Sequence, residues 1–189
     1  MSTSLLTKKA LAQALKQMMN ETPLGKITVQ QVADTCGVNR QTFYYHFQDI
    51  YELLGWIYET EAVAGIAAYR SYDTWTDGFL RIFHYIENNK AVCLNTLHSL
   101  AKNHLEAYLH AVTNDLILGV IQELSVDLDV RDTDKKFMAN FYTMGFVGLI
   151  MEWLAASMTE KPEVLIANLN LLIEGNFIRA LHRYADKNP

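Results

Sequence analysis

The stretch from Thr28 to Phe47, TVQQVADTCGVNRQTFYYHF, constrains the fold of this chain most strongly. Thr28 is a good helix N-cap, because its hydroxyl can accept a hydrogen bond from an amide two or three residues later. Ala33 is small enough to let two helices cross closely. Gly37, four residues on, can take the left-handed conformation that a chain leaving a helix often needs. The stretch therefore predicts two short helices joined by a tight corner.

The second of these helices has an inner and an outer face. Asn39 can cap it, and Phe43 and Phe47, four residues apart, form its apolar side. At about 100° per residue, the opposite side carries polar and aromatic side chains, namely Arg40, Gln41, Tyr44 and Tyr45. An arginine can pair with guanine and a glutamine with adenine, while tyrosine hydroxyls can reach phosphates or base edges. Such a pair of helices is typical of a helix-turn-helix that binds DNA.

Each side chain of the motif has an expected role. The residues that should build it are Ala33, Gly37, Asn39, Phe43 and Phe47. Those that should meet DNA are Thr28, Arg40, Gln41, Thr42, Tyr44, Tyr45 and His46. Arg40 is the first candidate for base readout and Gln41 the second, whereas the two threonines should bind phosphate. The tyrosines could instead pack against the first helix, but both cannot do so while the phenylalanines occupy the inner face.

The run resembles the DNA-binding domain of TetR-family transcriptional regulators. Their recognition helix typically ends in a Tyr-Tyr-His-Phe-like tetrad, which residues 44–47 match here. Five positions stand in register with the family pattern at once, namely Thr28, Ala33, Gly37, Thr42 and Phe47, the last of the tetrad. The chain departs from the pattern just afterwards, where many members carry lysines and this chain has Gln48, Asp49 and Ile50. Fewer phosphate contacts are expected there.

This resemblance implies an all-α fold with two parts. A three-helix helix-turn-helix domain at residues 1–48 would be joined to a helical dimerisation and effector domain at residues 49–189. The last two helices of each subunit would pair into a homodimer. The dimer would bind a palindromic or near-palindromic operator in double-stranded DNA, and an unidentified small-molecule or protein effector would control it. A repressor released by its effector is the default expectation.

Two other stretches resemble a subgroup that includes regulators of dihydroxyacetone kinase genes. They are FQDIYELLGWIYE at residues 47–59 and GFVGLIMEWLAASM at residues 145–158. If this resemblance extends to control, the effector would be a partner protein and the output activation. The pocket residues that would bind a small molecule cannot be assigned from the sequence.

Composition and hydrophobic periodicity agree with a helical protein. The chain has 189 residues, of which 50% are hydrophobic and 20% charged, so it can bury a sizeable core. Strand-like alternation is nearly absent. The apolar pattern predicts helices at about residues 4–22, two short helices within 28–47, and further helices at about 49–69, 75–88, 90–99, 103–125, 133–158 and 162–184.

The net charge of −5 is divided unevenly along the chain. Residues 1–48 hold five basic and two acidic side chains, a net charge of +3, and the remainder holds 11 basic and 19 acidic, a net charge of −8. The positive charge therefore lies where phosphate would be met, and the acidic remainder should resist non-specific binding. The excess is too mild to indicate DNA binding by itself.

The apolar stretch Phe141–Met158, with Glu152 as its one charge, could also span a membrane. Its polar side chains and the lack of a basic flank favour a helix buried by protein on several sides, as in a dimeric bundle. Cys36 and Cys93 lie in apolar helical patterns, which favours a reducing compartment. No charged region leads into an apolar stretch with a cleavage site, so no signal peptide is expected. We expect a cytoplasmic protein without membrane partners.

Other function classes find less support. The residues His84, Cys93, His98, His104 and His110 have irregular spacings, so no metal site or cofactor is expected, and a metal-responsive regulator is a minor alternative. The acidic residues near 127–134 lack the glycine and terminal glutamate of a calcium loop. No catalytic motif is present, so the protein should not be an enzyme. A helical interaction protein with a vestigial helix-turn-helix is the alternative from another class.

Overall fold

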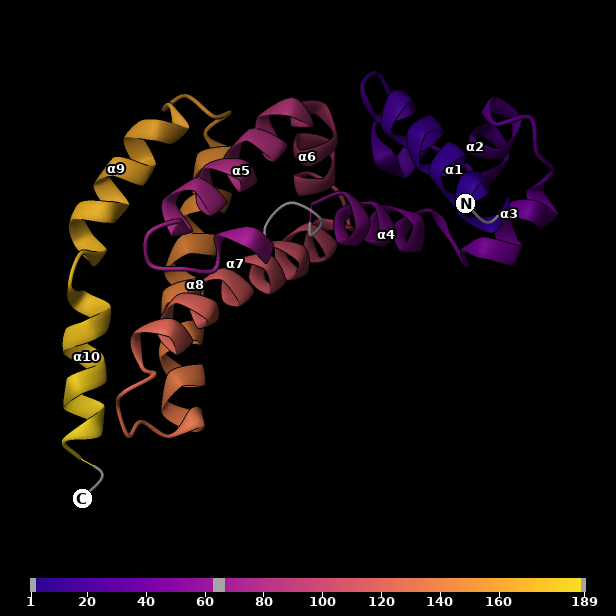
Figure 1. The fold of residues 1–189 in the computed structure, drawn as a ribbon. Coiled ribbons are helices and arrows are strands. Elements are labelled where there is room, and N and C mark those ends of the chain that lie inside the picture. The colour runs from indigo at the N-terminus through magenta and orange to yellow at the C-terminus, as the bar shows by residue number, and fades with distance from the viewer. Residues whose placement is uncertain (1–2, 63–66, 188–189) are drawn as a thin grey trace. The chain divides into compact units, whose positions relative to one another are not determined.

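A computed structural model describes residues 3–62 and 67–187, and the regular structure in these ranges is entirely helical (Figure 1). The all-α class is confirmed. The α-helices are α1 (Thr3–Met19), α2 (Val29–Thr35), α3 (Arg40–His46), α4 (Ile50–Ala62), α5 (Trp75–Asn88), α6 (Lys90–Leu97), α7 (Lys102–Leu124), α8 (Asp132–Ala155), α9 (Pro162–Ile173) and α10 (Asn176–Ala185). Two 3₁₀ turns join them, η1 (Leu24–Lys26) and η3 (Ala67–Tyr69).

The chain divides into two compact units. The N-terminal unit comprises Met1–Glu61 and Asn89–Tyr108, and the C-terminal unit comprises Ala62–Asn88 and Leu109–Pro189. The N-terminal unit therefore extends past residue 48 to include most of α4, and it also takes in α6 and the start of α7. The reason is that α6 packs against α1, a contact between segments far apart in the sequence.

The core of the N-terminal unit lies where α1, α2 and α3 meet. Its fully buried side chains include Leu11, Leu15, Val32, Ala33 and Phe43. α1 ends at Met19, a turn earlier than the sequence pattern predicts. Pro23 helps to end the helix here, because it has no N–H to donate to the Met19 carbonyl four residues earlier.

The core of the C-terminal unit contains four fully buried apolar side chains of α5, which are Phe79, Ile82, Phe83 and Ile86. Two of them meet aromatic residues of α8. The ring centroids of Phe79 and Phe146 are 4.3 Å apart, and those of Phe83 and Trp153 are 4.8 Å apart. α5 also packs along α9, so α5 is covered by both helices.

The prediction of one helix over residues 162–184 is wrong. α9 ends at Ile173 and α10 begins at Asn176, as Figure 1 shows by the bend between them. Gly175 has a φ of +69°, in the left-handed region that glycine adopts without a side-chain clash. Because the apolar periodicity continues through the break, the sequence pattern did not identify Gly175 as the end of a helix.

Two other helix ends also differ from the expectation. α8 ends at Ala155 instead of Met158, because Ser157 and Met158 have φ values of 60° and 61°, outside the helical region. The helix expected to run to Tyr69 is described as far as Ala62, and residues 63–66 of that prediction lie outside the described part of the chain. Residues 67–69 form η3.

In the described residues, one stretch is long and apolar enough to cross a membrane by length and composition, namely Pro162–Ala185. It is not the stretch that the sequence pattern singled out, which lies in α8. The break between α9 and α10 interrupts it, and the charged residue Glu174 lies at the break. Apolar composition alone therefore does not decide what covers this stretch.

The two cysteines should differ sharply in reactivity. Burial raises the pKa of the fully buried Cys93 thiol to about 12, and it raises the pKa of the half-buried Cys36 thiol as well. Because the thiolate is the nucleophile, Cys93 should resist a disulfide reagent until the protein unfolds. The raised pKa of Cys93 also means that folding is stabilised below pH 9.0 and that this stability is lost as the pH rises toward 12.

A thiol titration with and without denaturant tests this prediction. The native Cys36→Ser variant should show almost no fast-reacting thiol, and denaturant should expose one. Fast labelling of native Cys36→Ser would contradict the burial of Cys93.

Candidate nucleic-acid interface

The corner between α2 and α3 is built from local hydrogen bonds. Thr28 caps α2: its hydroxyl accepts from the Gln31 N–H at 3.3 Å, and the Gln31 side chain accepts from the Thr28 N–H at 2.9 Å. At the other end, Gly37 has a φ of +68°. Its N–H and that of Val38 donate back to the carbonyls of Asp34 and Ala33, each at 3.0 Å. This bonding pattern is a Schellman motif, and it sets the angle at which the chain leaves α2.

The local sequence also orients α3. Asn39 caps the helix by accepting a hydrogen bond from the Thr42 N–H at 2.7 Å. Phe43 and Phe47 are buried, with ring centroids 6.0 Å apart. The side of α3 away from these rings is exposed and carries Arg40, Gln41, Tyr44 and Tyr45. Thr42 and His46 are half-buried at its margin.

Arg40 and Tyr44 form a pair on the exposed side of α3. The Arg40 Nε and Nη2 groups donate to the Tyr44 hydroxyl at 3.2 and 2.9 Å. The guanidinium carbon lies 5.3 Å from the Tyr44 ring centroid. Tyr44 therefore restrains a side chain that would otherwise be free to rotate. Tyr45, which is 82% exposed, extends from the same side.

The two threonines have hydroxyls that are already engaged within the protein. The Thr28 hydroxyl donates to the Gln31 side-chain oxygen at 2.8 Å, and the Thr42 hydroxyl donates to Asn39 Oδ1 at 3.0 Å. A phosphate would have to displace these bonds to receive either proton. In this arrangement both threonines serve the helix caps.

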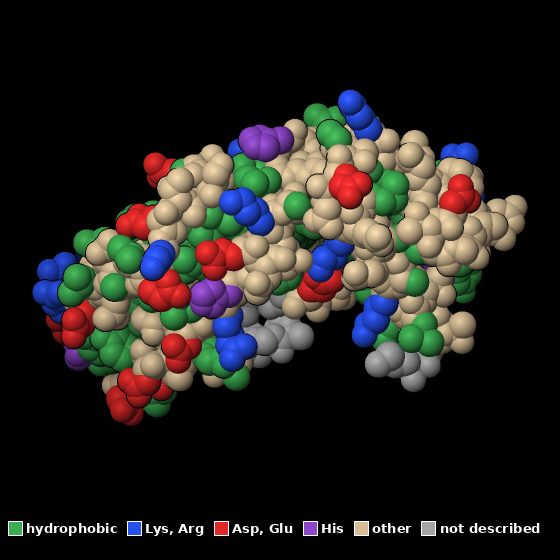
Figure 2. Space-filling view, turned by 90° about the horizontal axis from the view of Figure 1, so that it is seen from above, with side chains coloured by type: hydrophobic (Ala, Val, Ile, Leu, Met, Phe, Trp, Pro, Cys, Tyr) green, Lys and Arg blue, Asp and Glu red, His purple; other side chains and the backbone are tan. Residues whose placement is uncertain are grey.

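The start of α4 carries acidic caps instead of lysines. Asp49 accepts a hydrogen bond from the Glu52 N–H at 2.8 Å, and Glu52 accepts one from the Gln48 N–H. A helix N-terminus attracts phosphate, but here two carboxylates of the chain itself occupy that end. On the face drawn in Figure 2, Lys and Arg side chains are scattered among acidic and apolar ones. The start of α4 therefore presents carboxylates where lysines would attract phosphate.

Two lysines of α1 have partners that the sequence does not indicate. Lys16 forms an ion pair with Glu61 at 2.6 Å. The Lys8 ammonium lies 5.3 Å from the ring centroid of Phe47 and 5.9 Å from that of Trp56. Lys8 thus lies beside the end of α3, whereas Lys16 is paired with a residue of α4.

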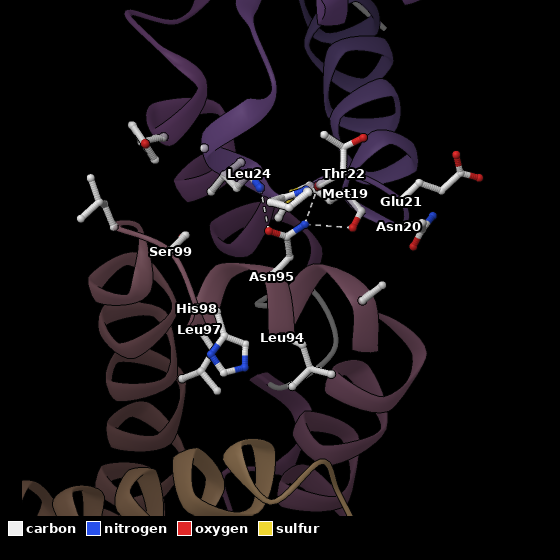
Figure 3. Close-up of a pocket in the computed structure, with 15 residues that line it drawn as sticks. Met19, Asn20, Glu21, Thr22, Leu24, Leu94, Asn95, Leu97, His98 and Ser99 are labelled. Atoms are coloured by element: carbon white, nitrogen blue, oxygen red, sulfur yellow. Dashed lines mark hydrogen bonds between the residues drawn. The ribbon is translucent and has the colours of Figure 1, made fainter.

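A groove of about 910 Å³ lies in the N-terminal unit between the end of α1, η1 and α6 (Figure 3). Its wall includes Met19, Leu24, Tyr51, Leu94, Leu97 and His98. Asn95 of α6 also lines it and is hydrogen-bonded to the backbone on the opposite side (Figure 3). The sequence pattern placed Asn95 on a helix without a role.

The described residues include no group of three or more His, Cys, Asp or Glu side chains that could hold a metal ion. Of the histidines considered for such a site, His84 lies 3.0 Å from Glu87 and 3.8 Å from Glu163. The first contact lies within α5, and the second joins α5 to α9.

A capped, all-helical helix-turn-helix with an exposed polar and aromatic second helix defines a DNA-binding regulator. Residues 11–55 match the bacterial regulatory proteins of the tetR family, and residues 73–175 match a transcriptional regulator C-terminal region. The chain belongs to the tetR family. This family consists of non-enzymatic regulators that bind DNA through the helix-turn-helix.

Individual relatives agree with this assignment. The chain is 28% identical over 153 residues to the HTH-type dhaKLM operon transcriptional activator DhaS of Lactococcus lactis subsp. lactis (strain IL1403), covering 80% of this chain and 81% of DhaS. A solved structure of dihydroxyacetone kinase operon activator DhaS superposes with a TM-score of 0.71 at 22% identity, covering 96% of this chain and 99% of that one. NalD, the secondary repressor of the MexAB-OprM multidrug efflux pump in Pseudomonas aeruginosa, gives 0.62 at 17% identity, covering 94% and 96%. The looser resemblance to dihydroxyacetone kinase regulators is thus confirmed.

Proposed function

We propose that the protein is a homodimeric transcriptional regulator that reads two operator half-sites through the exposed side of α3. The pair formed by Arg40 and Tyr44 is the observation that carries this proposal. The two hydrogen bonds to Tyr44 restrain the guanidinium on the exposed side of α3, and a restrained guanidinium loses less freedom when it pairs with a guanine edge. Half-sites should lie about 34 Å apart, one helical turn, or a multiple of that distance.

The remaining contacts divide by chemistry. Gln41 is exposed next to Arg40 and suits a second base contact. Tyr45 suits a phosphate or base edge, and the half-buried His46 suits a bridge to phosphate. Thr28 and Thr42 contribute first as caps, so their phosphate contacts would be secondary. The acidic start of α4 leaves most of the binding to α3.

An exposed apolar face on the C-terminal unit supports dimerisation. On α8 it is formed by Phe137, Phe141, Met144, Gly145 and Gly148, and on α9 by Val164, Ala167 and Leu171. We call these eight residues the α8–α9 face. Phe141 is 65% exposed and Leu171 75% exposed, and a Cβ added at either glycine would meet no atom within 4 Å. Exposed apolar residues that recur along one side of a helix in this way mark an interaction site.

A second copy of the chain is the proposed occupant of the α8–α9 face. Two such faces can pair isologously about a two-fold axis, and a two-fold dimer matches a palindromic operator. A membrane is the less suitable occupant, because the stretch that is long enough breaks at Gly175 with Glu174 beside it.

The relative DhaS favours activation over repression as the output. Its similarity extends over 80% of this chain, which includes both units. We propose an activator in the cytoplasm, where the DNA lies, under the control of a small-molecule or protein effector of the C-terminal unit. Repression is the second candidate, since the structural relative NalD is a repressor. A reporter driven by the bound promoter distinguishes the two: deletion of the gene should lower expression for an activator and raise it for a repressor.

An operator-binding titration tests the proposed function itself. The purified protein should retard its own upstream DNA in a sequence-dependent way, and its affinity should fall as salt rises. A vestigial helix-turn-helix would show no preference over unrelated DNA of equal length. That outcome would overturn the proposal.

The Arg40→Ala variant should bind the operator about 1–3 kcal/mol more weakly, if the guanidinium makes a bidentate base contact. The loss should also relax the preference at one base position of each half-site. A fluorescence anisotropy titration against single-base operator variants measures both effects. Arg183→Ala removes an exposed arginine of α10 and serves as the control. A uniform loss across all operator variants would assign Arg40 to phosphate instead.

A further inference from the structure

Asn95 of α6 makes three hydrogen bonds to the backbone between α1 and α2 (Figure 3). Its Nδ2 group donates to the Met19 carbonyl at 3.0 Å and to the Thr22 carbonyl at 2.7 Å. Its Oδ1 atom accepts from the Leu24 N–H at 2.7 Å. Both amide hydrogens and one carbonyl lone pair are thus used on a single segment of six residues.

The chemistry of that segment explains why an amide fits it. A helix leaves its last carbonyls without partners inside the helix, and Met19 is the last residue of α1. Pro23 follows directly and has no N–H to offer. Asparagine supplies two donors and an acceptor on one short, planar group, which is what two carbonyls and one N–H require. The bonds are partly buried, so losing them would leave backbone groups poorly satisfied.

The bonded segment leads straight into the helix-turn-helix. Leu24 begins η1 and is buried, as is Ile27, which immediately precedes the Thr28 cap of α2. The position of η1 therefore determines where α2 starts. Because the corner at Gly37 is rigidly bonded, the start of α2 in turn determines the direction of α3.

The next residue on α6 holds a different helix. The Thr96 hydroxyl donates to the Val92 carbonyl at 2.8 Å, so its contact with the Tyr58 hydroxyl, also at 2.8 Å, uses the Tyr58 proton. Tyr58 lies on α4 and is fully buried. Asn95 and Thr96 thus connect α6 to the entry of the helix-turn-helix and to the helix that follows it. These contacts all lie within the N-terminal unit.

We propose that Asn95 is a positioning residue for operator binding. It holds η1 and the start of α2 against α6, and so it sets the direction in which α3 is presented to DNA. α6 then contributes to operator binding by holding the helix-turn-helix in place, although α6 begins more than 40 residues after the motif. This inference rests on the proposed function, because it concerns how the same operator is bound.

Asn95→Ala and the matched control Asn103→Ala test the role. Asn103 is an exposed asparagine at the start of α7, in the same unit. Asn95→Ala should bind the operator at least tenfold more weakly, with an unchanged salt slope and unchanged base preference. It should also discriminate less between the natural half-site spacing and spacings altered by one base pair. Asn103→Ala should match the wild type in every measurement.

Spacing discrimination separates positioning from mere stability. A variant that is only less stable has fewer active molecules, each with the wild-type preference for spacing. Wild-type affinity in Asn95→Ala, or weaker binding with unchanged spacing discrimination, would overturn the inference. If the wild type shows no sequence-dependent binding at all, the proposed function fails instead.

If Asn95→Ala does not fold, hydrogen exchange of the wild-type protein tests the inference instead. The Leu24 amide of the wild-type protein donates to Asn95, so its exchange reports directly on this contact. Operator DNA should slow that exchange, because the contact belongs to the DNA-binding form. Equal exchange with and without operator would overturn the inference.

Discussion

Replacing Phe43 by alanine should lower the free energy of unfolding by about 3–5 kcal/mol, the range measured for buried aromatic residues. Its side chain is 0% exposed, and its ring lies 5.8 Å from that of Tyr44 and 6.0 Å from that of Phe47. It fills the angle between α2 and α3, so the cavity would open at the centre of the helix-turn-helix. Neighbouring backbone cannot easily close it, because the caps at Thr28 and Asn39 fix both helices.

The measurement is urea unfolding followed by circular dichroism, together with operator binding at low temperature. Tyr45→Ala provides the control for stability, since this neighbouring aromatic is 82% exposed and its loss should change stability by about 0.5 kcal/mol or less. Tyr45→Ala should nevertheless weaken operator binding. If both variants lost equal stability, the assignment of Phe43 as the central core residue would be wrong.

Phe141→Glu on the α8–α9 face should convert the dimer into monomers. The substitution would bring two carboxylates into an apolar interface, where unpaired charges are costly. Without the dimer, the second half-site is no longer bound at a high effective concentration, and affinity should fall by about 10²–10⁴-fold. Analytical ultracentrifugation measures the first effect and operator titration the second.

Val126→Glu is the matched control for this variant. Val126 is 78% exposed but lies in the connector between α7 and α8, away from the α8–α9 face. The change of an exposed apolar residue to glutamate should leave both the dimer and the operator affinity intact there. If Phe141→Glu remained a dimer, the dimer interface would lie elsewhere on the protein. If the wild-type protein partitioned into membranes, a second copy of the chain would be excluded as the occupant of this face.

Local interactions explain why the helix-turn-helix could be predicted from the sequence. The Thr28 and Asn39 caps, the Gly37 turn and the pairing of Phe43 with Phe47 all join residues within five positions of each other. Such contacts depend on side-chain type and spacing, which a sequence displays directly. The tetR-family resemblance rests on the same positions.

Non-local contacts explain what could not be predicted. The hydrogen bonds of Asn95 span 71–76 residues and end on backbone atoms, which carry no signature in the sequence. The membership of α6 in the N-terminal unit follows from such contacts. The ion pair of Lys16 with Glu61 also joins residues far apart in the sequence, so the sequence pattern does not indicate it. The charge balance of residues 1–48 instead places Lys16 among the basic residues that would meet DNA.

The sequence by itself determined an all-α regulator with a helix-turn-helix at residues 28–47, because caps, turns and apolar spacing are local features that can be recognised in a sequence. Tertiary structure alone decided which side of the apolar part of α8, from Phe141 to Ala155, remains exposed, since that depends on which helices pack against it. It also decided that Asn95 of α6 is hydrogen-bonded to the backbone at the entry to the motif. Side-chain rotamers and long-range packing determine which partner a residue contacts. Composition and periodicity do not distinguish between the possible partners.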